Sequence, residues 1–230
     1  MLLICGGLMR TGSVAMFQVM REIVERNGGY APVLRHGEEA EQFDATAKHW
    51  AEDKKPLVLK LHRWRDSLEG LDTRVVMTIR DMRDVTVSLM NFRGGGFEAA
   101  LHSGAFKGNL DGQEEWEKIV PKHKLLKVRY EDFVMDRPRT TLQVARFMGI
   151  NIPGPEAVEI ERKWNLQANK LRAKEGHSID SIEYMSERHI QSGATGQWQT
   201  ELTPDQIMDV QKRVGLKWFL DNGYPPYDLV

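Results

Sequence analysis

Cysteine is almost absent from this sequence, which has one, Cys5, among its 230 residues. One thiol cannot form an internal disulfide or a metal cluster, so the composition suits a reducing compartment and we expect a cytoplasmic protein. No stretch approaches the roughly 18 consecutive apolar residues that a membrane span needs, so we expect no membrane association. The apolar start, MLLICGGLM, is short and has no basic residues before it, and we interpret it as a buried strand rather than a signal peptide.

An excess of charge of either sign is also missing. The 32 Lys and Arg residues nearly balance the 33 Asp and Glu residues, which gives a formal net charge of −1. The whole chain is therefore not expected to attract nucleic acid or an anionic membrane surface, and any anion site must be local. With 41% hydrophobic and 28% charged residues, the composition is that of an ordinary globular protein, for which one α/β domain is the natural expectation.

Short apolar runs alternate with helical patterns along the chain. We predict strands at Leu2–Cys5, Pro56–His62, Arg74–Ile79 and Lys124–Tyr130, with helices beginning near Val14, after Asp81 and at Pro138. This alternation predicts an α/β fold of three layers, a central parallel sheet flanked by helices, with ligands bound beyond the carboxyl ends of the strands. The Gly94–Gly96 run and the polar stretch Asn165–Ser192 predict loops or lids near 93–122 and 165–197.

The turn after the first predicted strand has an anion-binding pattern. It reads GGLMRTGSVAMF, and its Gly7 and Gly12 have the spacing of a phosphate-binding loop. A nucleotide triphosphatase needs Lys at position 13 and Ser or Thr at position 14, whereas this chain has Ser13 and Val14, which makes ATP or GTP hydrolysis the weaker interpretation. On this pattern alone, a glycine turn that binds nothing is an equal alternative.

Five segments, in the same order along the chain, resemble segments of the PAPS-dependent sulfotransferases, where PAPS is 3′-phosphoadenosine 5′-phosphosulfate. They are MRTGSVA (9–15), KLH (60–62), IRDMRDVTVS (79–88), VRYEDFVMDRP with the following ARFMGI, and GATGQWQTELTP (193–204). The first resembles the phosphosulfate loop, the second the strand end with the general base, and the third and fifth the 3′-phosphate segments. The resemblance covers most of the chain and implies one P-loop-like domain over residues 1–230. It also implies transfer of a sulfuryl group from PAPS to an acceptor hydroxyl or amine.

The resemblance assigns a role to each matching residue. The residues implied to bind PAPS are Arg10, Thr11, Gly12, Ser13, Val14, Arg80, Ser88 and Gly193, and those implied to act in the transfer are His62 as general base with Arg10 and Lys60 as charge stabilisers. No metal is required. From the residues alone, Arg80 at a strand end could hold a phosphate in a two-pronged contact, with Ser88 donating from the next helix. The alternative makes Arg80 a surface ion-pair partner of Asp81 or Asp84.

Some positions depart from the family pattern or lie beside it. Ala15 replaces a tryptophan that in many members faces the adenine, and Gln191 with Ser192 stand where an arginine-lysine pair is usual. Arg188 is close enough in sequence to replace that pair, which is our hypothesis for it. The carboxylate of Glu131 comes directly after a predicted strand, and we expect it to hold backbone N–H groups near the site rather than to act in acid–base chemistry.

Two other functions stay open at this point. A nucleotide or nucleoside kinase on a related fold would need Mg-ATP and the lysine that is missing after Gly12. A degenerate nucleotide-binding module would bind the nucleotide product without turnover. If the chain is a sulfotransferase, we expect its acceptor to be a small molecule or a glycan, and the pattern does not choose between them.

Overall fold

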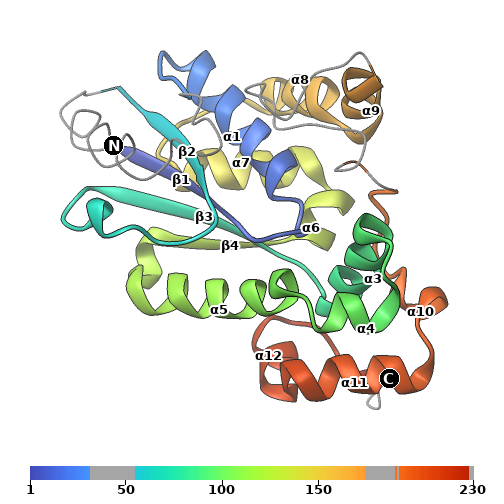
Figure 1. The fold of residues 1–230 in the computed structure, drawn as a ribbon. Helices are drawn as coiled ribbons and strands as arrows, with labels where there is room; N and C mark the ends of the chain where they lie inside the picture. Colours follow the sequence, from blue (N-terminus) through green and yellow to red (C-terminus); the bar gives the residue numbers. More distant parts are fainter. Residues whose placement is uncertain (32–54, 175–189, 191, 228–230) are drawn as a thin grey trace.

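The computed structural model describes residues 1–31, 55–174, 190 and 192–227, and its centre is a parallel sheet (Figure 1). Its four strands follow the order β2-β1-β3-β4, and each pair of neighbours is parallel. The strands are β1 (Leu2–Gly7), β2 (Leu57–Leu61), β3 (Thr73–Ile79) and β4 (Leu125–Arg129). All four predicted strands are confirmed, although β4 ends one residue early because Tyr130 begins helix α6 (Tyr130–Met135).

Helices lie on both faces of this sheet and beyond its strand ends (Figure 1). They include α1 (Ser13–Arg26), α3 (Met82–Arg93), α4 (Gly96–Leu101), α5 (Gly104–Ile119), α7 (Arg137–Phe147), α8 (Gly154–Trp164), α9 (Leu166–Lys174), α10 (Trp198–Glu201), α11 (Pro204–Val214) and α12 (Leu216–Asp221), with short 3-10 turns at Asp66–Leu68 and Lys122–Lys124. Helices α1, α7 and α8 cover one face and α5 covers the other. The predicted α/β fold with a central parallel sheet is confirmed.

Alternation along the strands builds a core on each face of the sheet. In β1, Leu3 and Cys5 face helix α1, and Leu2 and Ile4 pack on the other side with Trp116 of α5. Successive side chains of a strand point to opposite faces, so a continuous apolar run is what a strand buried on both faces requires. Each such side chain contributes roughly 1.5–3 kcal/mol when fully buried. These two cores fix the strand ends at which the polar residues described below gather.

The range 93–122, which we expected to be a loop or lid, is instead mostly helical. Gly94 ends α3 with a left-handed backbone (φ 71°), and α4 begins only two residues later. The side chain of Ser103 then caps α5 by accepting from the backbone N–H of Phe106 at 3.1 Å. The glycine run therefore separates two helices rather than marking a long loop, and the expectation was wrong here. Within 165–197, residues 166–174 form α9, and 175–189 lie outside the described residues.

A third apolar cluster joins the C-terminal helices to α3 and α4. Its members include Val85 of α3, Phe106 of α5, and Ile207 and Phe219 of the C-terminal helices. The C-terminal part of the chain thus packs beside the carboxyl end of β3, where α3 begins. This position explains how residues near 195 reach residues near 80.

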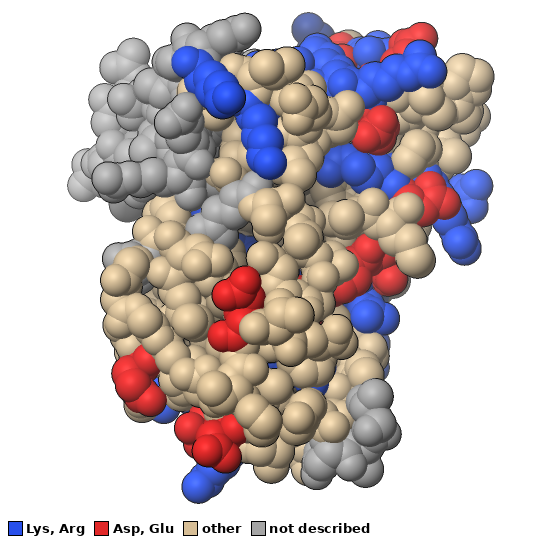
Figure 2. Space-filling model, turned by 90° about the vertical axis from the view of Figure 1, so that its right-hand side faces the viewer, with Lys and Arg blue, Asp and Glu red and all other residues tan. Residues whose placement is uncertain are grey.

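On the face viewed in Figure 2, Lys and Arg side chains gather in the upper part, at the level of α8 and α9 in Figure 1, while Asp and Glu side chains are scattered over both the upper and the lower part. The sequence of α9, LQANKLRAK, carries three basic residues and no acidic one. Helix α9 is therefore a local concentration of positive charge. Among the helices of the described part of the chain, none is long and apolar enough to cross a membrane.

Candidate active site

The turn between β1 and α1 wraps back over the strand end. Arg10 has a left-handed backbone (φ 65°), which is uncommon for a residue with a side chain, and Gly12 follows with φ 83°. The hydroxyl of Thr11 bonds the carbonyl of Leu8 at 2.8 Å and the hydroxyl of Thr78 on β3 at 2.8 Å, which fastens the turn to the sheet. The N-cap residue of α1 is Gly12, which has no side chain to cap the helix, so the first backbone N–H groups are disposed to bind an anion.

Arg10 reaches from this turn to helix α3. Its Nε donates to Ser88 Oγ at 2.9 Å, and its guanidinium lies over the ring of Phe92 at 4.8 Å from the ring centre. Burial, together with the nearby charge of Arg80, lowers the pKa of Arg10 to about 10. Arg10 therefore still carries its positive charge at neutral pH. Two residues matched to separate segments of the sequence, Arg10 and Ser88, are in direct contact.

Arg80 follows the carboxyl end of β3 and is buried, with 6% of its surface exposed. Its Nη1 donates to the carbonyl oxygen of Arg10 at 3.3 Å, and its Nη2 donates to that of Ala194 at 2.8 Å. The guanidinium also lies over the ring of Tyr130 at 4.5 Å. Within the described part of the chain, Nε of Arg80 is buried without a hydrogen-bond partner. The alternative for Arg80 is confirmed in one respect and wrong in another: Arg80 forms an ion pair with Asp84 at 3.6 Å, but both side chains are buried, so the pair is not on the surface.

The N-terminal turn and the Arg80 strand end thus open on the same side of the sheet. Arg80 donates a hydrogen bond to the carbonyl of Arg10, and Arg10 in turn donates one to Ser88. The turn and the strand end are therefore in direct contact. The buried guanidinium of Arg80, the half-buried guanidinium of Arg10 and the N-terminus of α1 converge there. Such a constellation can hold a ligand that carries two anionic groups.

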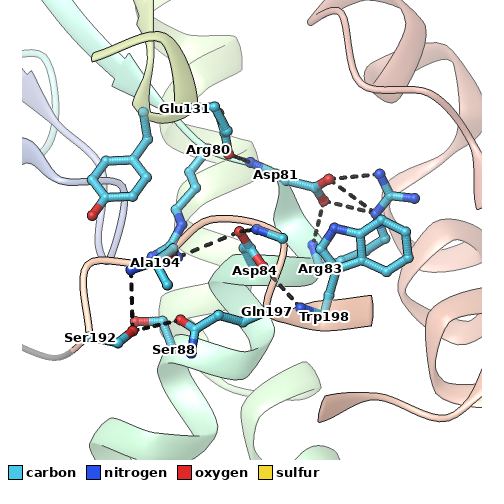
Figure 3. A network of polar contacts seen from close by, with 12 residues as sticks. Arg80, Asp81, Arg83, Asp84, Ser88, Glu131, Ser192, Ala194, Gln197 and Trp198 are labelled. Atoms are coloured by element: carbon cyan, nitrogen blue, oxygen red, sulfur yellow. Dashed lines mark hydrogen bonds and ion pairs between the residues drawn. The ribbon is translucent and has the colours of Figure 1, made fainter. Parts of the chain in front are cut away.

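The segment from residue 192 to residue 198 lies against Arg80 (Figure 3). The hydroxyl of Tyr130 donates to the carbonyl of Gly193 at 3.0 Å, and Asp84 accepts from the backbone N–H groups of Gly196 at 2.7 Å and Trp198 at 3.1 Å. Burial raises the pKa of Tyr130, so its hydroxyl keeps the proton that it donates. Gly193 therefore lies beside Tyr130 and next to the residue that Arg80 contacts, and its predicted part in binding PAPS stays a prediction. Arg188 and Gln191 lie outside the described residues.

Glu131 has the structural role that we expected for it. Its Oε1 accepts from the backbone N–H of Asp81 at 3.3 Å, and its Oε2 accepts from the hydroxyl of Tyr224 at 2.7 Å. Burial raises the pKa of Glu131. The carboxylate thereby joins the end of β4 to the residue after Arg80 and to the C-terminal segment. Asp81 in turn caps α3 by accepting from the backbone N–H of Arg83 at 2.9 Å, at the start predicted for this helix.

His62 and Lys60 lie together at the carboxyl end of β2. Nδ1 of His62 contacts the carbonyl oxygen of Gly7, which can only accept a hydrogen bond, so we assign the ring proton to Nδ1. Nε2 then holds the lone pair, and it lies 3.3 Å from Nζ of Lys60. Lys60 pairs in register with Cys5 of the neighbouring strand, so both side chains lie beside the turn that follows β1. The arrangement presents a basic nitrogen next to an ammonium group.

Comparison with known proteins decides the family of this chain. The model of the sulfotransferase domain matches residues 9–219. The chain belongs to the sulfotransferase family. No curated protein matches the sequence significantly.

Several solved structures have a fold similar to that of this sulfotransferase. Mouse sulfotransferase SULT7A1 complexed with PAP is 17% identical, with a TM-score of 0.66 over 93% of this chain and 81% of that chain. Retinol dehydratase in a complex with retinol and PAP is 17% identical, with a TM-score of 0.65 over 96% and 80%. The sulfotransferase domain from the curacin biosynthetic pathway is 11% identical, with a TM-score of 0.56 over 97% of both chains. At these identities the likeness concerns the fold.

Sequence reasoning missed the contacts of three residues that shape the site of this sulfotransferase, although it named Asp84 as a possible partner of Arg80. Tyr130 and Asp84, described above, hold the segment 192–198. Asn109 of α5 holds the N-terminal turn, because its side chain accepts from the backbone N–H of Met9 at 2.7 Å and donates to the carbonyl of Met9 at 2.7 Å. Each of these contacts joins residues far apart in sequence, and no local pattern announces them.

Thr11, Ser13 and Val14 have less to offer a ligand with their side chains. The hydroxyl of Thr11 is engaged within the protein, and that of Ser13 bonds the carbonyl of Leu8 at 3.2 Å. Val14 packs against the core cluster beside α1. The binding role predicted for these three residues would therefore require their backbone N–H groups rather than their side chains.

Proposed function

We propose that this sulfotransferase transfers a sulfuryl group from PAPS directly to an acceptor hydroxyl or amine. The observation that carries the proposal is the meeting of Arg10, Ser88 and Arg80 on one side of the sheet. PAPS has a phosphosulfate at one end and a 3′-phosphate at the other. A single nucleotide can therefore bridge the N-terminal turn and the Arg80 strand end.

The residues present fit this donor. The uncapped N-terminus of α1 would hold the phosphosulfate through the backbone of residues 10–14, and Arg80, Ser88 and Gly193 would hold the 3′-phosphate. Nε of Arg80, which finds no acceptor among the residues that the structure describes, supports the assignment, because a buried charged donor without an acceptor is costly unless a ligand supplies one. When bound, PAPS supplies the sulfuryl group and leaves as adenosine 3′,5′-bisphosphate.

His62 acts as the general base in this proposal. Its Nε2 accepts the acceptor's proton as the bond to sulfur forms, and its Nδ1, held at the Gly7 carbonyl, keeps the ring oriented. Lys60 and Arg10 place positive charge beside the group being transferred. Arg10 acts through its charge and not as an acid, since its pKa of about 10 leaves it protonated at neutral pH.

A thermal-shift comparison separates this function from a kinase. Adenosine 3′,5′-bisphosphate at a hundred times its dissociation constant should stabilise the protein by about 2.7 kcal/mol, and Mg-ATP should have little effect. A response to Mg-ATP alone would reverse the assignment. Transfer from radiolabelled PAPS to a panel of phenols, amines, alcohols and glycans then tests for turnover. Binding of the bisphosphate without transfer to any acceptor would favour the degenerate nucleotide-binding module.

A further inference from the structure

Asp84 links the segment 192–198 to the base of helix α3 (Figure 3). Its side chain is buried, with 1% exposed, and both carboxylate oxygens face that segment. Oδ2 accepts from the backbone N–H of Gly196 at 2.7 Å, and Oδ1 accepts from that of Trp198 at 3.1 Å. Hydrogen bonds to an ionised carboxylate are about twice as strong as those between neutral groups. The segment is thus fixed at two backbone positions by one side chain.

Arg80 holds the same segment from its other end. Its Nη2 donates to the carbonyl of Ala194 at 2.8 Å, while the carboxylate of Asp84 lies 3.6 Å from that Nη2. The contact between Arg80 and Asp84 is longer than a hydrogen bond, whereas both bonds from Asp84 to the segment are within normal range. Asp84 therefore accepts two hydrogen bonds from the segment and also forms a longer, buried ion pair with Arg80.

The composition of the segment makes its position important. Residues 192–198 read SGATGQW and contain no Lys or Arg. A flexible cationic side chain can adjust to a phosphate, but a backbone N–H group or a short hydroxyl can contribute only where the main chain is held. Any contribution of this segment to anion binding must therefore come from a main chain whose place is set by Asp84, Arg80 and Tyr130.

We propose that Asp84 is the positioning residue that holds the segment 192–198 over Arg80 and so gives this protein its preference for a nucleotide with a 3′-phosphate. The inference rests on the proposed function. The end of the segment is held as well, because the ring of Trp198 lies 3.9 Å from the guanidinium of Arg83. Asp84 does not touch the reacting atoms and acts through the segment and Arg80.

A simpler view of Asp84 makes the opposite prediction. If its carboxylate merely neutralised Arg80, it would compete with the phosphate, and Asp84→Asn would tighten nucleotide binding. If it positions the segment, the same change weakens binding, because an amide can accept one of the two N–H groups but turns an N–H donor toward the other. The sign of the effect therefore separates the two roles.

The experiment measures the affinities of adenosine 3′,5′-bisphosphate and of AMP, which lacks the 3′-phosphate, by titration calorimetry. In Asp84→Asn we expect the affinity for the bisphosphate to fall at least about tenfold while that for AMP changes less than about threefold. We also expect the KM for PAPS to rise more than kcat falls. A general loss of stability would not change the ratio of the two affinities. Asp209→Asn, at an exposed carboxylate on α11, is the control and should keep the wild-type ratio.

A milder variant covers the case in which Asp84→Asn does not fold. The hydroxyl of Ser192 accepts from the backbone N–H of Ala194 at 3.2 Å and bonds Oε1 of Gln197 at 2.9 Å, and Ser192 is exposed. Ser192→Ala loosens the same segment without disturbing the core, and we expect it to lower the ratio about threefold.

Two results would overturn this inference but not the proposed function. The first is a wild type that prefers the bisphosphate together with an Asp84→Asn variant whose ratio of bisphosphate affinity to AMP affinity is unchanged or increased. The second applies if Asp84→Asn does not fold, and is an unchanged ratio in Ser192→Ala. A different result, a wild-type protein that binds AMP as tightly as the bisphosphate, would refute the proposed function, and the inference would fall with it.

Discussion

Gly12 should be intolerant of even one added methyl group, because the ring of Tyr130 lies directly against it. A Cβ atom at this position would lie 2.4 Å from Cδ2 and 2.7 Å from Cε2 of Tyr130. The backbone of Gly12 is also left-handed, with φ 83°. The same ring stacks on Arg80, so the substitution tests the junction between the two proposed halves of the donor site.

The expected cost of Gly12→Ala has two parts. A left-handed conformation costs a residue with a side chain roughly 1–2 kcal/mol. Forcing a methyl group into a packed site adds typically about 1–3 kcal/mol. We therefore expect the free energy of unfolding to fall by about 2–5 kcal/mol. We also expect weaker binding of adenosine 3′,5′-bisphosphate, because the displaced ring moves away from Arg80.

Gly28 offers a matched control for the backbone part. It also has a left-handed backbone, with φ 77°, but an added Cβ would meet nothing within 4 Å. Gly28→Ala should therefore cost only about 1–2 kcal/mol. The reduced entropy of the unfolded chain, which favours any Gly→Ala change, is common to both variants and cancels in their comparison.

Urea unfolding of the wild type and both variants measures the difference in unfolding free energy between Gly12→Ala and Gly28→Ala. Repeating the measurement in a Tyr130→Ala background tests whether the ring of Tyr130 causes that difference. With the ring removed, the extra cost of Gly12→Ala over Gly28→Ala should largely disappear. Equal costs for the two glycine variants in the wild-type background would refute the close approach of Tyr130. An extra cost that persists without the ring would assign it to another contact.

Three further predictions follow from the site. His62→Ala should leave the affinity for adenosine 3′,5′-bisphosphate nearly unchanged while the transfer rate falls at least about a hundredfold, and full activity would remove His62 from the mechanism. Asn109→Ala should lower kcat, because it releases Met9. Its control is Gln113→Ala, at a buried amide one turn later on α5, which should lower stability but not kcat. Equal kcat in the two variants would contradict the role of Asn109. Cys5, whose pKa is raised to about 12 by burial, should resist alkylation in the native protein at pH 8 and react after unfolding, as mass spectrometry can determine.

The sheet could be predicted from the sequence because its signal is local. Apolar runs such as Leu2–Cys5 can only be buried on both faces, and the helical patterns between them leave a parallel order as the natural arrangement. The helices of 93–122 were missed because the run of glycines was interpreted as one loop. The start signal was present, since Ser103 precedes α5 and caps it. Boundaries failed where one residue, Tyr130, could end a strand or begin a helix.

The two ends of the site could be predicted because both follow strands whose carboxyl ends share one edge of the sheet. This rule brings Arg10 and Arg80 together without knowledge of any contact between them. What holds them could not be predicted in this way. The contact of Asn109 with Met9 spans 100 positions, and that of Asp84 with Gly196 spans 112. Such contacts depend on how α5 and the C-terminal helices pack, which a local pattern does not encode.

The most direct test of the donor site is a crystal structure of the protein with adenosine 3′,5′-bisphosphate. The account predicts the 5′-phosphate at the N-terminus of α1, against the backbone of residues 10–14, and the 3′-phosphate within hydrogen-bonding distance of Arg80 and Ser88. A nucleotide bound away from Arg80, or with only one of its phosphates at these two places, would contradict the central claim that both ends of one donor are held on the same side of the sheet.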